Sequence, residues 1–222
     1  MKDHEHAGEP RDETLGQAIE VARAFLNALS FGDHARAAAM VAPSGQAAFR
    51  EVQLCSLTGW AQQRDAISAL QRGGTDSAVG WNSDGVYRPE QLARVGDTPL
   101  VAVSGVRTLG EFAALPPAEF LARYLDVSTP RSSAGEGEPM ERPRYLVLGG
   151  VVDGHDVVHV LYRCTSPGYH DPHHVDVLRI VQTDGVWSVD IATAGHEIVN
   201  SSWLMLSMQH DWFADGPNAD DS

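Results

Sequence analysis

The chain has 222 residues, of which 43% are hydrophobic, and a formal net charge of −14 at pH 7. This length and apolar content are typical of one globular domain with a sizeable core, and the acidic balance argues against nucleic-acid and anionic-membrane partners, which attract basic surfaces. No apolar stretch is long enough to cross a bilayer, and two cysteines, Cys55 and Cys164, do not make a disulfide framework. We therefore expect a single cytoplasmic domain over residues 1–222.

The N-terminal part predicts two helices in succession. Residues 1–12 form a polar, flexible lead without the apolar run of a signal peptide. Apolar residues then recur at helical spacing over Thr14–Ser30. Gly32 can end this helix in the left-handed conformation, and Asp33 can cap a second, alanine-rich helix that stops at Pro43.

Residues 13–127 as a whole predict a helical part with one strand, and residues 128–144 a mobile loop rich in Pro, Ser, Gly and Glu. The strand is expected at Leu100–Val106, where β-branched residues are frequent. Further helices are expected at Gln46–Cys55, where the pattern is ambiguous and favours helix, and at Thr58–Gln71, Pro89–Val95, Thr108–Ala114 and Pro117–Leu125.

Residues 145–192 predict a meander of four consecutive strands. The β-rich runs are Tyr145–Val152, Val157–Thr165, Val175–Thr183 and Val186–Ala192. Asp184-Gly185 between the last two runs is the strongest short-range hairpin signal in the chain. Residues 193–222 then predict a C-terminal helix within Glu197–Phe213 and an acidic tail.

The hairpin signal predicts which side chains share a face of the sheet. If only two residues make the turn, Ile180 faces Val189 and Arg179 faces Asp190. One face is then apolar and should pack on the helices, whereas the other is mixed. The mixed face collects four titratable side chains, which are His159, Arg163, Arg179 and Asp190. They fit either a solvated or dimer-facing surface with one ion pair, or a catalytic cluster.

A histidine-rich run, His170-Asp171-Pro172-His173-His174, contains residue types that bind metals, and His155 and His196 could join it. Pro172 stiffens the run, and its spacing matches no structural zinc pattern. We therefore expect a turn there and no metal. The sequence also contains no Gly-rich phosphate loop and no nucleophile elbow, so we expect no cofactor.

Three segments together resemble the NTF2-like (cystatin-like) superfamily, which includes the SnoaL-like, polyketide-cyclase-like and ketosteroid-isomerase-like proteins. The segments are Val21–Leu29, Gly32-Asp33 and Asp184–Trp187, which cover the first helix pair and the last two strands. The resemblance implies an α+β cone, in which N-terminal helices pack on a curved, mostly antiparallel sheet and leave a pocket at the open end. The middle of this chain, residues 46–143, is enlarged relative to that pattern and mainly helical.

The superfamily contains both enzymes and binding proteins, so the resemblance leaves open whether this protein is an enzyme. The favoured hypothesis is non-catalytic binding of a small apolar molecule or a protein partner in the cone pocket. The pocket would be lined by Phe25, Leu29, Tyr124, Leu178, Ile180, Trp187 and Val189.

The alternative hypothesis is a small-molecule isomerase, dehydratase or cyclase. His159 and Asp190 would act as acid and base, and Arg163 or Arg179 would hold a negative substrate oxygen. The resemblance also implies a homodimer formed through the outer face of the sheet. Such an interface would bury Val157, Leu161, Val177 and Val181.

Overall fold

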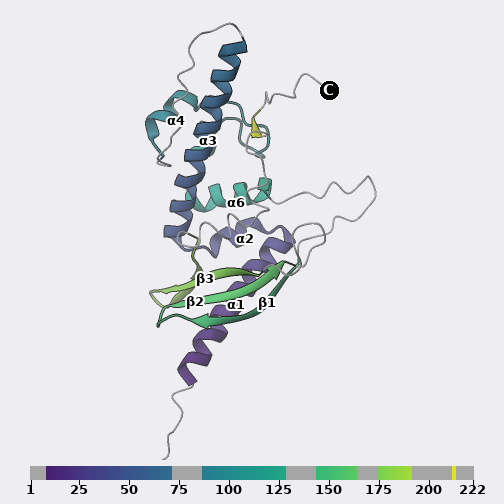
Figure 1. The fold of residues 1–222 in the computed structure, drawn as a ribbon, viewed down its shortest axis with the longest axis vertical. Helices are drawn as coiled ribbons and strands as arrows, with labels where there is room; N and C mark the ends of the chain where they lie inside the picture. The colour runs from purple at the N-terminus through teal and green to yellow at the C-terminus, as the bar shows by residue number, and fades with distance from the viewer. Residues whose placement is uncertain (1–8, 72–86, 129–143, 165–174, 192–211, 214–222) are drawn as a thin grey trace, which may run out of the picture.

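A computed structural model describes residues 9–71, 87–128, 144–164, 175–191 and 212–213, and Figure 1 shows their arrangement. Six helices precede four antiparallel strands in this part of the chain, so the fold is α+β, as predicted. None of the helices in these ranges combines the length and the apolar character needed to cross a membrane.

Several predicted features lie outside the described residues. They include the histidine-rich run at 170–174, nearly all of the loop at 128–144, the acidic tail and most of the C-terminal helix expected within 197–213. Two residues of that last segment, Trp212 and Phe213, are described, and both are buried.

The first two helices form close to where they are predicted, but the first begins at Glu9 and not at Thr14, so residues 9–12 are helical and the prediction of a flexible lead is wrong for them. Helix α1 spans Glu9–Phe31, and Gly32 follows it with a φ of +72°, a conformation that glycine adopts without a steric penalty. The Asp33 side chain accepts a hydrogen bond from the backbone N–H of Arg36 at 3.2 Å, which caps α2, His34–Ala39. The tight turn brings α2 back against α1.

Helix α3 runs without interruption over Pro43–Gln71. The two helices expected at Gln46–Cys55 and Thr58–Gln71 are therefore one. Pro43 ends the segment after α2, as predicted, but it also begins α3, because proline at the first helical position has no N–H bond to lose. The buried side of α3 carries Phe49, Leu54, Leu57 and Ala61.

Three shorter helices follow, close to their predicted positions. They are α4, Pro89–Val95, α5, Leu109–Ala113, and α6, Pro117–Ser128. The side chain of Thr108 caps α5 by accepting a hydrogen bond from the backbone N–H of Glu111 at 3.1 Å. Helix α6 lies against both α2 and α3 (Figure 1).

The strand expected at Leu100–Val106 does not form, so that prediction is wrong. Residues 101–105 make bends and a turn, and Leu100 forms only an isolated bridge with Phe213. The backbone folds back on itself here, since the N–H of Leu100 donates to the carbonyl of Arg107 at 2.9 Å. A β-rich composition makes a strand only where a partner strand lies alongside.

The four strands form a meander in the order β1-β2-β3-β4. They are β1, Tyr145–Val152, β2, Val157–Cys164, β3, Asp176–Thr183, and β4, Val186–Val189. Asp184 and Gly185 alone make the last turn, with φ values of +51° and +78°, as a two-residue hairpin requires. Ile180 therefore pairs with Val189, which confirms the predicted register.

The apolar face of the sheet is buried, as predicted. Its buried residues are Val158, Val160, Tyr162, Cys164, Leu178, Ile180, Val189 and Ile191. Helix α1 crosses the sheet and contacts all four strands (Figure 1). On β1, a Cβ added to Gly150 would lie 2.9 Å from Cδ1 of Leu15. A side chain at position 150 would require the Leu15 side chain to move.

A cluster of aromatic rings joins the helical layer. Phe112 and Phe120 stack with their centroids 4.2 Å apart, Phe49 meets Tyr124 edge-to-face at 4.9 Å, and Tyr124 lies 5.1 Å from Trp212. Such pairs contribute about 0.5–1.5 kcal/mol each beyond the area that they bury. The cluster holds one side of α6 in the core and leaves its other side to face outward.

Candidate functional site

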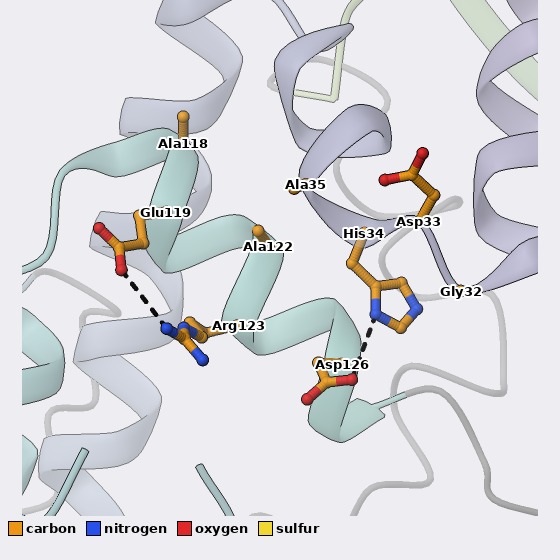
Figure 2. A pocket seen from close by; sticks show the side chains of 9 residues that line it. All are labelled: Gly32, Asp33, His34, Ala35, Ala118, Glu119, Ala122, Arg123 and Asp126. Carbon is orange, nitrogen blue, oxygen red and sulfur yellow. Dashed lines mark ion pairs between the residues drawn. The ribbon is translucent and has the colours of Figure 1, made fainter. Parts of the chain in front are cut away.

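A groove of about 510 Å³ lies between the start of α2 and the outward side of α6 (Figure 2). This volume falls within the range of small-molecule sites, roughly 300–1,000 Å³. The groove is lined by Gly32, Asp33, His34, Ala35, Ala118, Glu119, Ala122, Arg123 and Asp126.

One side of α6 forms one wall of the groove. Its lining residues are Ala118, Glu119, Ala122, Arg123 and Asp126, which recur at the three- and four-residue spacing of one helix side. Phe120 and Tyr124 lie on the other side and are buried in the aromatic cluster. The position of this wall is therefore set by core packing.

Small side chains keep the groove open. Ala35 on α2 and Ala118 and Ala122 on α6 present only methyl groups between the two helices. They supply an apolar lining, against which a ligand can bury hydrocarbon surface at about 25 cal/mol per Å². A larger side chain at position 122 would occupy the space that a ligand needs.

A histidine–carboxylate pair closes one end of the groove. Nδ1 of His34 lies 3.4 Å from Oδ1 of Asp126 (Figure 2), and the pair links α2 to α6. The His34 side chain is 10% exposed and that of Asp126 is 42% exposed. The contact can form with the neutral ring, which donates through Nδ1, or with the protonated ring, as an ion pair.

A second ion pair lies along the α6 wall. Nη2 of Arg123 is 3.7 Å from Oε1 of Glu119, and Nη1 of Arg123 donates to the backbone carbonyl of Ser104 at 3.1 Å. Both side chains are more than 40% exposed, so the pair itself is worth at most about 1 kcal/mol. These contacts hold the guanidinium, the only arginine in the lining, at the rim.

Three of the four residues predicted as a titratable cluster are divided between two contacts, and the fourth, Arg163, takes part in neither. Arg179 and Asp190 form the predicted cross-strand ion pair, and the Asp190 side chain is only 11% exposed. His159 pairs across the sheet with Arg179 in the strand register, but its Nε2 lies 3.3 Å from Oδ2 of Asp153. The structure therefore gives His159 a different carboxylate from Asp190. Nε of Arg163 is buried without a hydrogen-bond partner.

The seven residues predicted to line an apolar pocket lie elsewhere than in the groove. Six of them are at most 4% exposed and belong to the packed core, namely Phe25, Leu29, Tyr124, Leu178, Ile180 and Val189. Trp187 is half-buried, and its Nε1 donates to Oε1 of Gln17 on α1 at 3.0 Å.

The sequence analysis did not identify His34 or Asp126 as site residues. His34 is the only histidine between His6 and His155 and directly follows the recognised Gly-Asp pair, which was a usable signal. Asp126 carries no local signal, because it is 92 positions away and meets His34 only through the packing of α6 on α2.

The described residues were also compared with the requirements of a metal site, and the chain with known proteins. Within the described ranges, no three His, Cys, Asp or Glu side chains converge as metal ligands would. Comparisons of the chain with protein-family models, with curated proteins and with solved structures find no match.

Proposed function

We propose that this protein binds a small organic molecule non-catalytically in the groove between α2 and α6. The observation that carries the proposal is the combination of a 510 Å³ groove, an alanine lining and the His34–Asp126 pair at one end. Small-molecule sites typically combine apolar walls with a few polar groups that orient the ligand. The groove has this composition.

The groove replaces the cone interior as the binding site in this proposal. The residues expected to line an interior pocket pack against one another, and the aromatic cluster fills the space beside α6. Opening a cavity there would forfeit about 2–5 kcal/mol for each large side chain displaced. Binding in the groove requires no such rearrangement.

A ligand screen with a matched pair of variants tests the proposal. We expect a panel of small compounds with apolar bodies, followed by protein-observed NMR, to give at least one binder that shifts amide signals of α2 and α6. Ala122→Phe fills the groove and should abolish that binding. Ala47→Phe, at an exposed alanine of α3 outside the groove, should leave it unchanged. A panel without binders, or binders that tolerate Ala122→Phe, would contradict the proposal.

We also propose that the fold is an NTF2-like cone. Support comes from the order of the elements, with helices before an antiparallel meander, and from α1 lying across the buried face of the sheet. An experimental structure in which the sheet is flat, or in which α1 leaves its buried face, would contradict this assignment.

The outer face of the sheet supports a further proposal, a homodimer. Leu146, Leu148 and Val151 of β1 are 52%, 45% and 60% exposed, and Val157 and Leu161 of β2 are half-exposed beside them. Several exposed apolar side chains on one face of a sheet are typical of an interaction surface. A second copy is the favoured occupant, because an isologous contact pairs this patch with itself.

Native mass spectrometry tests the dimer with two valine substitutions of similar exposure. Val151→Glu places a charge within the patch and should convert dimer to monomer. Val52→Glu, at a 62% exposed position on α3, should leave the dimer intact. A wild-type protein that is monomeric at micromolar concentration would contradict this proposal without affecting the groove.

A further inference from the structure

We infer that the helical layer contains, on the inner side of α6, a docking site for an extended peptide segment with two adjacent aromatic residues. The chain's own Trp212–Phe213 occupies this site. The segment leaves the site and returns while the rest of the protein stays folded, so the same segment supplied as a separate peptide can take its place. The site lies on the opposite side of α6 from the groove and does not depend on the function proposed for the groove.

Rings from two helices enclose the Trp212 indole. Its centroid lies 6.1 Å from that of Phe112 on α5 and 5.1 Å from that of Tyr124 on α6. Trp212 is only 2% exposed, and Phe213 beside it is 4% exposed. An aromatic side chain enclosed in this way is typical of the anchor residue of a docked segment, because it buries much apolar area at a small cost in side-chain entropy.

The backbone of the aromatic pair joins a turn of the chain as an added strand does. Leu100 donates its N–H to the carbonyl of Arg107 at 2.9 Å, whereas the next residue, Val101, donates its N–H to the carbonyl of Trp212 at 2.8 Å. Leu100 also forms an antiparallel bridge with Phe213. Peptides that add a strand to an exposed edge bind with such main-chain hydrogen bonds, and side-chain pockets give them specificity. Val101 is 62% exposed, so this edge lies at the surface.

The connection to the sheet does not fix the position of the aromatic pair. Residues 192–211 separate Trp212 from Ile191, which follows β4. About 20 residues can span roughly 65 Å, so covalent linkage alone allows many positions. Figure 1 shows the pair, in yellow, beside the helices and away from the sheet. The contacts with the helical layer therefore hold the pair in place, and an identical segment from outside the chain can make the same contacts.

Binding of a peptide to the full-length chain tests the site. The probe is a synthetic peptide of residues 209–216, and the double variant Trp212→Ala/Phe213→Ala provides the vacated site. We expect the peptide to bind this variant at least about 10-fold more tightly than wild type, because a segment linked within the same chain outcompetes a separate peptide. The same peptide with Trp212→Ala should bind the variant at least about 10-fold more weakly, since an aromatic anchor carries much of the binding energy. Isothermal titration calorimetry measures these affinities.

A second tryptophan provides the matched control. Trp187→Ala truncates a half-buried tryptophan of β4 and leaves the aromatic pair in the site, so this variant should bind the peptide no better than wild type. Circular dichroism checks that each variant is folded. Equal affinity of the peptide for wild type and the double variant, or no binding to the folded double variant, would overturn the inference.

Amide hydrogen exchange of the wild-type protein tests whether the segment leaves the site, and it decides the question even if the double variant does not fold. Release of the segment frees the N–H of Val101 from Trp212 but leaves the bond from Leu100 to Arg107 intact. We therefore expect the protection factor of Val101 to be at least about 10-fold lower than that of Leu100, and to be insensitive to low concentrations of urea. Equal protection of the two amides would mean that they open together, and the inference would be wrong.

Discussion

Two regions of the molecule bring a histidine close to an aspartate, and they differ in what surrounds the pair. On the sheet, His159 lies 3.3 Å from Asp153, with side chains 37% and 72% exposed. In the groove, His34 lies 3.4 Å from Asp126, with side chains 10% and 42% exposed. The distances are nearly equal, so distance alone does not distinguish a candidate site from a surface contact.

The difference lies in burial and in the adjacent space. Water competes for both partners of the His159–Asp153 pair, and such exposed pairs contribute about 0–1 kcal/mol. The His34 ring is mostly removed from water and borders the groove. A site requires both a polar group with a defined orientation and an apolar space beside it.

The largest expected loss of stability comes from truncating a buried side chain on the inner side of α6, behind the groove. Phe120 is fully buried in the aromatic cluster on the inner side of α6. Phe120→Ala should lower the free energy of unfolding by about 3–5 kcal/mol, because it removes a large side chain and leaves a cavity. Urea denaturation measures this loss. Glu119→Ala, the exposed neighbour on the groove side, should cost less than about 1 kcal/mol, and an equal cost for both variants would contradict the orientation of α6.

The next effect concerns the outer face of the sheet. Arg179→Met leaves the nearly buried carboxylate of Asp190 without its cation. A fully buried pair would lose about 3–5 kcal/mol, and the 27% exposure of Arg179 reduces the expected loss to about 2 kcal/mol. Chemical denaturation of the variant, compared with the double variant Arg179→Met/Asp190→Leu, should show that the second substitution restores stability. No restoration would mean that the pair is not coupled.

A direct comparison of the two histidines gives a smaller effect. His34→Ala should cost about 1–2 kcal/mol, because the ring is buried and paired across two helices. His159→Ala should cost less than about 0.5 kcal/mol, because its side chain is 37% exposed. Thermal denaturation of the two variants under one condition ranks them. A larger loss of stability for His159→Ala than for His34→Ala would contradict the difference between the two pairs.

The smallest effect is a pH dependence away from both regions. The backbone N–H of Arg107 donates to the Glu111 carboxylate at 2.8 Å and lowers the pKa of Glu111 below its usual 4.5. A lowered pKa means that the ionised form stabilises the folded state above about pH 4.5, and that this stabilisation is lost as the pH falls through the folded-state pKa.

Glu111→Gln tests this contribution. We expect the stability difference between wild type and Glu111→Gln to be largest at neutral pH and to shrink below pH 4.5, as measured by urea denaturation across the acid range. Glu51→Gln, an exposed glutamate on α3, provides the control for general charge effects. A difference that grows as the pH falls would contradict the assigned direction.

Turn chemistry made much of the fold predictable. Asp184-Gly185 determined the last hairpin and with it the Arg179–Asp190 pair, because a two-residue turn permits one register. The left-handed Gly32 and the Asp33 cap likewise placed the first helix boundary. In each case the residues that carry the signal are neighbours in the chain, so no knowledge of packing is needed.

Sequence patterns whose outcome depends on a distant segment of the chain predicted the structure less well. Leu100–Val106 is β-rich but forms no strand, because the backbone turns back on itself and only Leu100 bridges to Phe213. Pro43 marks the end of one segment and equally the start of α3. The candidate site was missed for the same reason, since His34 and Asp126 are far apart in the chain.

The amino-acid sequence by itself determined the helices with clear caps, the four strands, their register and the division of the sheet into an apolar and a mixed face. These properties depend on backbone preferences and on side-chain alternation, which act within a few residues. Only the tertiary structure decided that α6 packs beside α2, that small side chains leave a groove between them, and that His34 meets Asp126 there. A cavity is a property of how separate elements pack, and that packing is settled by the whole core.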